Sequence, residues 1–300
     1  MNILVTGHSG FIGGHIARHF AECGHVVHGV SRALRTDCEY KQYNIDITDC
    51  DALSRLASEK CIDVIVHFAG KPIIADCDKA PFHAFKINGI GTAAMLEAAR
   101  YAKVKKTLVI ETDKVYGLQE SVPTTEEATL NPGSPYELSK VFAAMFCDFY
   151  RNHYGMDVIS IRPVNVFGPG DFSFTRIVPA SMRNIANGKG IPVQEHATNI
   201  HREFIYVKDV AKMMYLLATT EAQYDVYNFS TNEPVSILKF ANRITKALNH
   251  DVEPIIVSKP GNYPEIPYQS IDGTRFNKEF NFAFTDFDDA IRETYREYCK

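Results

Sequence analysis

Several features that would direct the chain to a membrane, a secretory route or a nucleic acid are missing from the sequence. No apolar run comes near the about 18 residues that a membrane-spanning helix needs, and the first expected strand begins within two residues of the N-terminus, so we expect no secretory signal. The formal net charge of −4 gives no general attraction for nucleic acid or for an anionic membrane. We therefore expect a cytoplasmic protein without a nucleic-acid or membrane partner, which captures any phosphate locally.

Paired cysteines and metal-binding clusters are missing as well. The seven cysteines contain no C-x-x-C pair, and their odd number without a signal sequence fits a reducing compartment. His15 and His19 have the i, i+4 spacing of two metal ligands on a helix, but neither a third ligand nor an H-E-x-x-H motif accompanies them. We expect no metal site.

The clearest functional pattern lies in the first thirteen residues. Residues 3–5 form a short apolar strand, Gly7-x-x-Gly10-x-x-Gly13 follows, and a helix with one apolar face comes directly after. Glycines let backbone N–H groups approach a pyrophosphate, and the positive end of the helix dipole favours the anion. The spacing is not the common G-x-G-x-x-G, and three glycines can form a plain tight turn, but the order of strand, turn and helix predicts a dinucleotide site.

Strand and helix patterns alternate through the first half of the 300 residues. The expected strands are 3–5, 25–30, 43–46, 62–68, 107–111 and 157–161, with a long helix within 81–103 and another that starts at Pro135. This alternation predicts an α/β fold, a Rossmann-like doubly wound parallel sheet with a smaller C-terminal substrate-binding lobe. We place the dinucleotide-binding lobe at 1–164 plus about 200–230, where a strand at 202–207 returns to the sheet, and the second lobe at 165–199 plus 231–300.

Two of these strands end in residues that suit the cofactor, because strand ends in doubly wound sheets face the ligand. The turn His67-Phe-Ala-Gly70 is expected beside it. Ser31 and Arg32 follow the second strand, and a small polar residue before an arginine can accommodate the 2′-phosphate of NADP. NADP is therefore favoured, and NAD remains the alternative if Asp37 or Glu39 supplies the acid that bonds a ribose 2′-hydroxyl.

A candidate catalytic group combines a helix and a strand end. Tyr136 and Lys140 are four residues apart, so both side chains share one face of the predicted helix. A lysine ammonium beside a phenol lowers the pKa of that phenol from about 10 and makes it a usable base. Thr112, at the end of the preceding strand, can bond the same substrate oxygen. A Y-x-x-x-K pair alone is common on helix surfaces, and the combination with Thr112 and the glycine turn is what indicates chemistry.

With these residues in place, the chain resembles a known family along nearly its whole length. It is similar to the extended short-chain dehydrogenase/reductases that act on nucleotide sugars, the NAD(P)-dependent nucleotide-sugar epimerase/dehydratase family. The motifs that carry the resemblance are Thr6-Gly-His-Ser-Gly-Phe-Ile-Gly13, Asp46-Ile47, His67-Phe-Ala-Gly70, Asn88 with Gly91-Thr92, Val115-Tyr-Gly117, Tyr136-x-x-x-Lys140, Arg162-Pro-Val-Asn165 and Arg202-Glu-Phe-Ile-Tyr-Val-Lys-Asp209.

The resemblance implies a set of binding residues. For the cofactor these are Gly7, Ser9, Gly10, Phe11, Ile12, Gly13, Ser31, Arg32, Asp46, Ile47, Phe68, Ala69, Gly70, Lys71, Asn88, Tyr136, Lys140 and Pro163. For the nucleotide sugar they are Asn165, Val178, Arg202 and Lys259. Lys259 stands where related enzymes usually place an arginine for the diphosphate, so binding there is expected to be looser.

One departure from most of the family bears on the reaction. Thr112 is followed by Asp113 and Lys114, and this run resembles the 4,6-dehydratases of the CDP-glucose or UDP-N-acetylglucosamine type. Such an enzyme oxidises sugar C4, removes the C5 proton with a base, protonates the leaving C6 hydroxyl with an acid, and returns hydride to C6. Lys114 and Asp113 fit the roles of base and acid, beside Thr112, Tyr136 and Lys140.

The residues leave alternatives open. The chain can be a 4-epimerase or 4-keto reductase in which Asp113 and Lys114 only position the sugar, or, in a different class, a non-catalytic dinucleotide-sensing protein. We expect a UDP-N-acetylhexosamine or a related sugar as substrate, and inversion at C5 stays open.

A homodimer is also expected. Helices near 92–101 and 136–149 carry more large apolar residues than one sheet face needs, namely Met95, Phe142, Met145, Phe146 and Phe149. In the family that the chain resembles, these helices pair into a four-helix bundle.

Overall fold

The computed structural model describes residues 1–258 and 266–299, which form two compact units. The first unit contains Met1–Gly117, Glu126–Pro163 and Val210–Phe229. The second contains Leu118–Thr125, Val164–Asp209 and Ser230–Lys300. Residues 118–125 and 200–209 thus group with the second unit, although the sequence division placed them in the first lobe.

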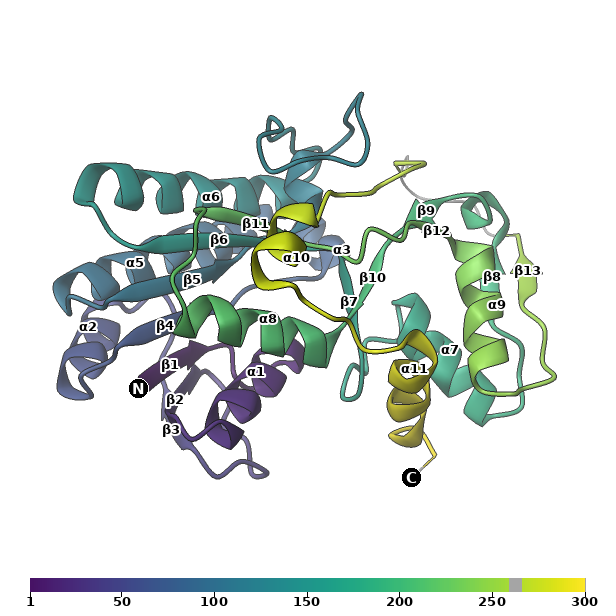
Figure 1. Ribbon diagram of the computed structural model, residues 1–300, viewed down its shortest axis with the longest axis horizontal. Coiled ribbons are helices and arrows are strands. Elements are labelled where there is room, and N and C mark those ends of the chain that lie inside the picture. The colour runs from purple at the N-terminus through teal and green to yellow at the C-terminus, as the bar shows by residue number, and fades with distance from the viewer. Residues whose placement is uncertain (259–265, 300) are drawn as a thin grey trace. The chain divides into compact units, whose positions relative to one another are not determined.

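A parallel sheet of seven strands forms the centre of the first unit, in the order β11-β6-β5-β4-β1-β2-β3 (Figure 1). Its strands are β1 (Asn2–Thr6), β2 (Val26–Ser31), β3 (Lys41–Asn44), β4 (Val64–His67), β5 (Lys106–Ile110), β6 (Val158–Pro163) and β11 (Val226–Phe229). Every neighbouring pair is parallel. The chain moves outward from β1 to β3 and then continues from β4 on the other side of β1, which is the doubly wound topology and confirms the predicted fold class.

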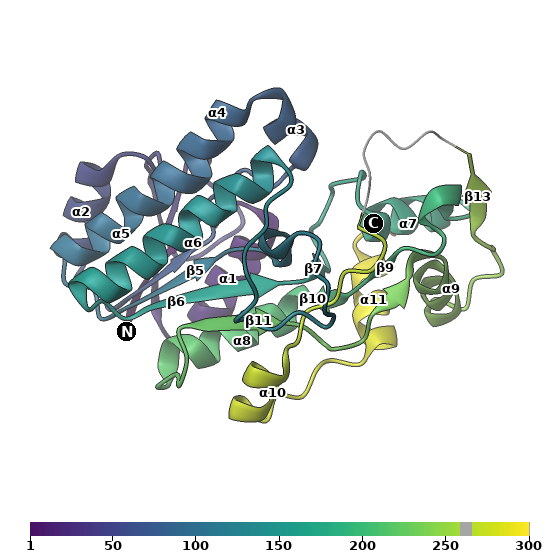
Figure 2. The same cartoon turned by 90° about the horizontal axis from the view of Figure 1, so that it is seen from above.

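Helices cover both faces of this sheet. On one face α2 (Cys50–Glu59), α5 (Gly91–Tyr101) and α6 (Pro135–Tyr154) lie side by side, and on the other lie α1 (Phe11–Glu22) and α8 (Val207–Thr219) (Figure 2). The start of α6 has a local cause, since Ser134 accepts a hydrogen bond from the backbone N–H of Glu137 and Pro135 occupies the first turn. The predicted start at Pro135 is confirmed.

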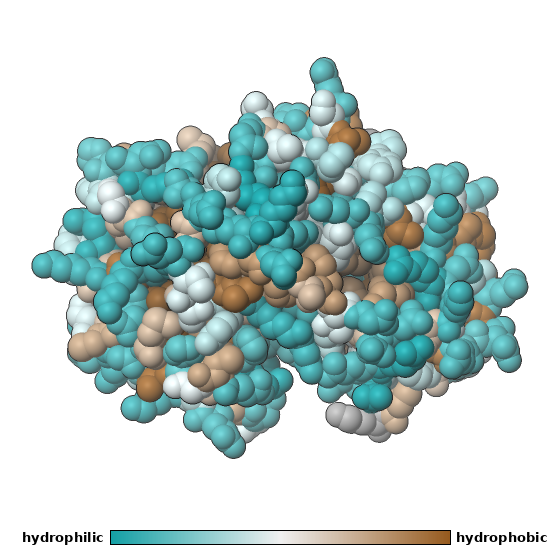
Figure 3. All heavy atoms as spheres, viewed as in Figure 1, coloured by the Kyte–Doolittle hydropathy of each residue, from teal (hydrophilic) through white to brown (hydrophobic). Residues whose placement is uncertain are grey.

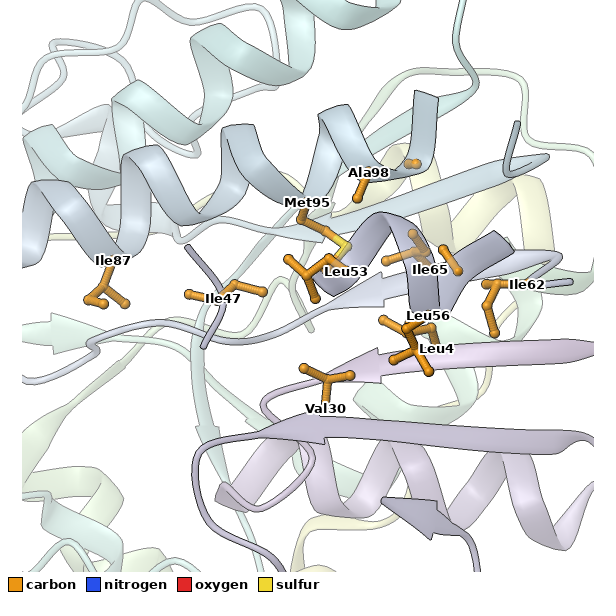
Figure 4. Close-up of a cluster of buried hydrophobic side chains, with 12 residues drawn as sticks. Leu4, Val30, Ile47, Leu53, Leu56, Ile62, Ile65, Ile87, Met95 and Ala98 are labelled. Atoms are coloured by element: carbon orange, nitrogen blue, oxygen red, sulfur yellow. The ribbon is translucent and has the colours of Figure 1, made fainter. Parts of the chain in front are cut away.

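One hydrophobic core of the unit lies between the sheet and helices α2 and α5 (Figure 4). Leu4 of β1 and Val30 of β2 meet Leu53 of α2 and Met95 of α5 in this cluster. Met95 is 1% exposed. The expectation that Met95 belongs to an exposed, dimer-forming face was therefore wrong, because α5 packs against α2 and turns this side chain inward.

The long helix predicted within 81–103 is interrupted. After α3 (Ile74–Lys79), α4 (Pro81–Ala84) leads into a π-helical segment, η1 (Phe85–Ile90), which continues as α5. Single π-helical turns inside α-helices occur frequently at functional sites. Asn88 lies within η1 and is buried.

The second unit contains three two-stranded sheets and four helices among its described residues. The paired strands are β7 (Asn165–Phe167) with β10 (Phe204–Tyr206), β9 (His201–Arg202) with β12 (Val235–Ser236), and β8 (Pro192–Gln194) with β13 (Ile255–Val257). The helices are α7 (Ile177–Ala186), α9 (Ile237–Ala247), α10 (Thr274–Phe280) and α11 (Phe287–Arg296).

The strand predicted at 202–207 does not return to the large sheet. It is divided into β9 and β10, and Glu203 lies between them. The buried Glu203 carboxylate accepts hydrogen bonds from the Ser270 hydroxyl at 2.5 Å and the Ile271 backbone N–H at 3.2 Å. These bonds and the parallel pairing of β10 with β7 hold the segment in the second unit, so that prediction was wrong.

The surface matches the ordinary composition of the chain. Figure 3 shows a face on which hydrophilic residues predominate and hydrophobic ones form small groups. Among the described residues, every helix is too short or too polar to cross a membrane.

Candidate active site

The glycine turn after β1 has the geometry of an anion cradle. Gly7 has φ +71°, and a Cβ atom there would lie 2.7 Å from the backbone nitrogen of Ala69. A Cβ atom at Gly13 would lie 2.4 Å from the carbonyl oxygen of Gly7. Only glycine fits at both positions. Gly10 is the N-cap of α1 and has no side chain to satisfy the first helical N–H groups, which leaves them for an anion. The residues present therefore fit a dinucleotide pyrophosphate.

At the end of β2 a buried histidine adjoins Ser31. His8 Nε2 lies 3.0 Å from the Ser31 hydroxyl, and His8 Nδ1 lies 3.3 Å from the Tyr40 hydroxyl. Burial, and then the charge of Arg35, lower the pKa of His8. Arg35 binds the Asp37 carboxylate with two hydrogen bonds, of 2.7 and 2.5 Å. Asp37, which is closer in the sequence to this strand end than the other acidic candidate, Glu39, is thus already paired with Arg35.

The residues expected at adenine follow β3. Asp46 Oδ1 accepts hydrogen bonds from the backbone N–H and the hydroxyl of Thr48, and these bonds lower the pKa of Asp46. Ile47 is buried and packs on Gly91 at the start of α5. This segment is therefore fixed in place by its own turn.

A network of hydrogen bonds ties the loop after β4 to α6. The amide oxygen of Asn88 accepts from the backbone N–H of Lys71 at 2.7 Å, and its nitrogen donates to the Ser139 hydroxyl at 2.8 Å. Ser139 in turn donates to the carbonyl oxygen of Tyr136 at 2.6 Å. Asn88 thus fixes the 68–71 loop relative to the first turn of α6.

His67 has a packing role. Its Nδ1 lies 2.7 Å from the Thr6 hydroxyl and its Nε2 lies 3.0 Å from the Thr92 hydroxyl. Burial, and then Lys140, lower the pKa of His67 to about 3, so the ring stays neutral at any working pH. The same Thr6 hydroxyl accepts the backbone N–H groups of Phe68 and Ala69, which closes the turn beside the glycine cradle.

The strand end after β5 carries the three reactive side chains that the sequence singled out. Thr112 caps the short 3₁₀ turn η2 (Asp113–Tyr116), and its hydroxyl donates to Asp113 Oδ1 at 3.1 Å. Lys114 Nζ lies 3.6 Å from the same carboxylate oxygen. The Asp113 side chain is 4% exposed and that of Lys114 is 24% exposed. A buried carboxyl group and a more accessible amino group therefore face each other at this strand end.

Tyr136 and Lys140 lie on the inward face of α6, and both are buried. Lys140 Nζ donates to the carbonyl oxygen of Ile110, the last residue of β5, at 2.9 Å. That bond fixes the amine beside the strand end that leads to Thr112. Burial lowers the pKa of Lys140 to about 8, although the charge of Glu111 works in the opposite direction. The amine is therefore partly neutral only near and above this pH.

The residues expected at the nucleotide sugar belong to the second unit. Asn165 donates from its amide nitrogen to the carbonyl oxygen of Glu203 at 3.0 Å. Arg202 donates to the carbonyl oxygens of His201 and Ile266, both at 2.8 Å. Val178 is buried within α7. Lys259 lies outside the described residues. Pro163 is the last residue of the Glu126–Pro163 segment of the first unit and is paired in register with Phe229.

Sequence reasoning missed the polar residues that support the site. Ser139, which links Asn88 to α6, was not singled out, and neither was Glu111, which binds Arg162. The one available signal was a carboxylate at the end of an otherwise apolar strand, next to Thr112. A buried acid in that place needs a partner, and the sequence did not say which residue that was.

A model of the NAD dependent epimerase/dehydratase family matches residues 3–230. The match covers more than half of the chain, and the chain belongs to this family, which confirms the predicted family and class of enzyme. The site residues stay predictions.

Relatives include both dehydratases and epimerases. The chain is 26% identical over 318 residues to a trifunctional UDP-glucose 4,6-dehydratase/UDP-4-keto-6-deoxy-D-glucose 3,5-epimerase/UDP-4-keto-L-rhamnose-reductase of Arabidopsis thaliana, with 100% of this chain and 47% of the relative covered. The chain thus spans about half the length of this relative.

Two crystal structures are similar over the whole chain. One is a UDP-glucose 4-epimerase from Thermotoga maritima with UDP-glucose, with a TM-score of 0.90, 25% identity, and 99% of this chain and 98% of that chain covered. The other is a dTDP-glucose 4,6-dehydratase from Streptomyces venezuelae with NAD bound, with a TM-score of 0.85, 25% identity, and coverage of 99% and 97%.

Proposed function

We propose that this chain is a nucleotide-sugar 4,6-dehydratase that acts on a UDP-N-acetylhexosamine or a related sugar. The observation that supports this most is the pair formed by Asp113 and Lys114, whose side chains lie 3.6 Å apart beside Thr112. Oxidation at C4 alone needs a base and a hydroxyl donor, which Tyr136 and Thr112 can supply. An additional acid and base one residue away suit the elimination of water across C5 and C6.

Each side chain has a defined task in the proposed reaction. The glycine cradle of Gly7, Gly10 and Gly13 would hold NAD(P), which would supply the hydride acceptor for sugar C4 and the hydride donor for C6. Tyr136 accepts the proton of the C4 hydroxyl, which Thr112 also bonds, and cationic Lys140 favours the phenolate. Lys114 removes the C5 proton and Asp113 protonates the C6 hydroxyl, which leaves as water. For these roles Lys114 acts as the free amine and Asp113 as the acid, and their side chains lie 3.6 Å apart.

The second candidate function is a nucleotide-sugar 4-epimerase or 4-keto reductase. The similarity to the Thermotoga maritima 4-epimerase favours it, since that structure has a TM-score of 0.90 against 0.85 for the dehydratase. In this case Asp113 and Lys114 would only bind sugar hydroxyls. A non-catalytic dinucleotide-sensing protein is the remote alternative, because such a protein has no need of Thr112, Tyr136 and Lys140 together. Asn165, Arg202 and Lys259 are the proposed diphosphate and nucleoside contacts in either enzyme.

Mass spectrometry separates these functions. The protein is incubated with cofactor and with UDP-N-acetylglucosamine, CDP-glucose and related nucleotide sugars, in deuterated water. A dehydratase removes one water from a sugar and introduces deuterium at C5, whereas an epimerase gives an isomer of unchanged mass, which an NMR spectrum of the same sample distinguishes from unreacted sugar. If none of these sugars is converted, the sensing protein gains support.

We also propose that the cofactor site prefers NADP. Ser31 at the end of β2 supplies no carboxylate for a ribose 2′-hydroxyl, and Asp37, the acid that could replace it, is bound by Arg35. Arg32 is exposed directly after Ser31, where its cation can meet a phosphate. NAD, which the Streptomyces venezuelae relative binds, is the alternative.

An Arg32→Ala variant is expected to lose NADP affinity by about one to two orders of magnitude, because a charge-assisted hydrogen bond contributes about 1.5 to 3 kcal/mol. Its NAD affinity should stay within about twofold of the wild type, which serves as the internal control. Fluorescence titration of both cofactors measures the two affinities. A purified protein that carries NAD, with no effect of the substitution, would show that Arg32 is a surface cation.

A homodimer through α5 and α6 is the proposed assembly. Met145 and Phe149 on α6 are 61% and 49% exposed, and Tyr101 at the end of α5 is 63% exposed. The spacing of Met145 and Phe149 puts them on one face of α6. Phe142 and Phe146 are half-buried, and Phe142 packs against Phe85.

Light scattering at micromolar concentration is expected to give twice the chain mass for the wild type. A Met145→Glu/Phe149→Glu variant should be monomeric, because two carboxylates would be buried in the interface without partners. A Phe172→Glu variant, at an exposed aromatic residue of the second unit, is the control and should remain dimeric. A monomeric wild type would eliminate the proposed dimer.

A further inference from the structure

A buried ion pair lies directly behind the reactive strand end. Glu111 follows the last residue of β5 and precedes Thr112, and its side chain is fully buried. Arg162, on β6, donates from Nε to Glu111 Oε2 at 2.6 Å, and its side chain is 6% exposed. Glu111 Oε1 is buried and has no hydrogen-bond partner among the described residues. One carboxylate oxygen of Glu111 thus binds Arg162. The other makes no hydrogen bond to the described residues and acts on its surroundings only through its charge.

The pair is connected to the turn that carries Asp113 and Lys114. Arg162 also donates to the Tyr116 hydroxyl at 3.0 Å, and that hydroxyl donates to the side-chain oxygen of Asn228 at 2.8 Å. Tyr116 is the last residue of η2 and is fully buried. The backbone on one side of Thr112 is therefore held by Glu111 and on the other side by Tyr116, both through one guanidinium group.

The same carboxylate acts on Lys140. The amine of Lys140 donates to the carbonyl oxygen of Ile110, the residue next to Glu111. Besides Tyr136 on the same face of α6, the charged or titratable groups that face Lys140 come from four elements: His67 of β4, Cys77 of α3, Cys147 of α6 itself, and Glu111 at the end of β5. His67 is neutral, and burial raises the pKa of both thiols, so these three carry no charge near neutral pH. Glu111 therefore supplies the negative charge among these four groups.

We propose that Glu111 is a positioning residue of the active site, which keeps Lys140 protonated and, with Arg162 and Tyr116, holds the Thr112–Lys114 turn in place. The inference rests on the proposed roles of Tyr136 and Lys140. It is independent of whether the sugar is dehydrated or epimerised, because both reactions begin with oxidation at C4.

The sign of the effect follows from the surroundings of Lys140. Burial penalises the ammonium form and lowers its pKa, whereas a neighbouring negative charge stabilises that form. Loss of the Glu111 charge therefore lowers the pKa of Lys140 further, and the ammonium is lost at a lower pH. At an effective dielectric constant of about 20, a single charge about 10 Å away shifts the pKa of a neighbour by about one unit.

The test is a Glu111→Gln substitution, followed by titration of the labelled Lys140 ε-carbon by NMR and by the pH dependence of NAD and NADP binding. We expect the Lys140 midpoint to fall by about one pH unit, and the alkaline loss of cofactor affinity to move with it. A Tyr116→Phe variant is the matched control, because it removes a hydrogen bond to the same guanidinium without changing any charge near Lys140. Its midpoint should match the wild type, and Glu111→Asp should restore the wild-type midpoint.

Glu111→Gln leaves Arg162 buried without a carboxylate, which can prevent folding. In that event the Glu111→Gln/Arg162→Gln variant keeps a neutral hydrogen-bonded pair, and the Lys140 midpoint is expected to fall by less than in Glu111→Gln, because the Arg162 cation is removed together with the Glu111 anion. If Glu111→Gln and Tyr116→Phe both weaken the fold while the Lys140 midpoint stays where it is, Glu111 only supports the structure and the proposal is overturned. Failure of the dehydratase assay would leave this titration unaffected, so the two proposals fail separately.

Discussion

A Lys114→Met variant is expected to oxidise the sugar at C4 without releasing water. Reduced cofactor should accumulate, with absorbance near about 340 nm, while loss of water and uptake of deuterium at C5 both stop. Tyr136, Lys140 and Thr112, which are proposed to serve the oxidation, are untouched by the substitution. Only the proposed base for C5 is removed.

The geometry around Lys114 is the reason for this expectation. Its side chain is 24% exposed, so it is accessible to a ligand, whereas the Asp113 carboxylate beside it is almost fully buried. Thr112 donates to that carboxylate and fixes its orientation. Methionine keeps most of the length of the lysine side chain and removes the amine, so the turn should stay in place and the variant should bind both ligands.

The measurement combines single-turnover absorbance with mass spectrometry of the sugar. Lys239→Met, at an exposed lysine of α9 in the second unit, is the control and should behave as wild type. Dehydration by Lys114→Met at nearly the wild-type rate would contradict the proposed role of Lys114 as the C5 base. A wild type that removes water from none of the nucleotide sugars would make the epimerase or reductase the better description.

A Tyr136→Phe variant is expected to lose about 10²- to 10⁴-fold in turnover, the usual contribution of a positioned acid or base. The phenol is proposed to accept the C4 proton, and phenylalanine cannot. The oxidation step itself should fail, so no reduced cofactor accumulates, in contrast to Lys114→Met. Cofactor affinity should change only a few-fold, because the glycine cradle and Lys140 remain.

Tyr116→Phe provides the comparison for this second substitution. Both tyrosines are buried, and each variant loses one hydroxyl. The Tyr116 hydroxyl bonds Arg162 and Asn228, whereas the Tyr136 hydroxyl is the proposed base. The Tyr116→Phe variant should lose some stability and, because Tyr116 holds the Thr112–Lys114 turn, part of the turnover, but much less than Tyr136→Phe. Equal losses of turnover in the two variants would argue against a catalytic phenol at position 136.

The relation between sequence and structure differs from one part of the site to another. The glycine turn and the start of α6 depend on neighbours within a few residues, so the sequence predicts them well. Gly10 caps α1 directly, and Ser134 with Pro135 begins the helix that carries Tyr136 and Lys140. Helix geometry alone then puts these two side chains on one face.

The sequence by itself determined the family, the doubly wound fold and the local motifs, because hydrophobic period, glycine spacing and capping act over short distances. Only the tertiary structure decided that Glu111 pairs with Arg162, 51 residues away, and that 202–207 divides into two strands outside the main sheet. It also decided that the Met95 side chain lies in the core, because α5 packs against α2. The partner of a buried charge and the neighbour of a strand are set by packing between distant segments, which no local pattern encodes.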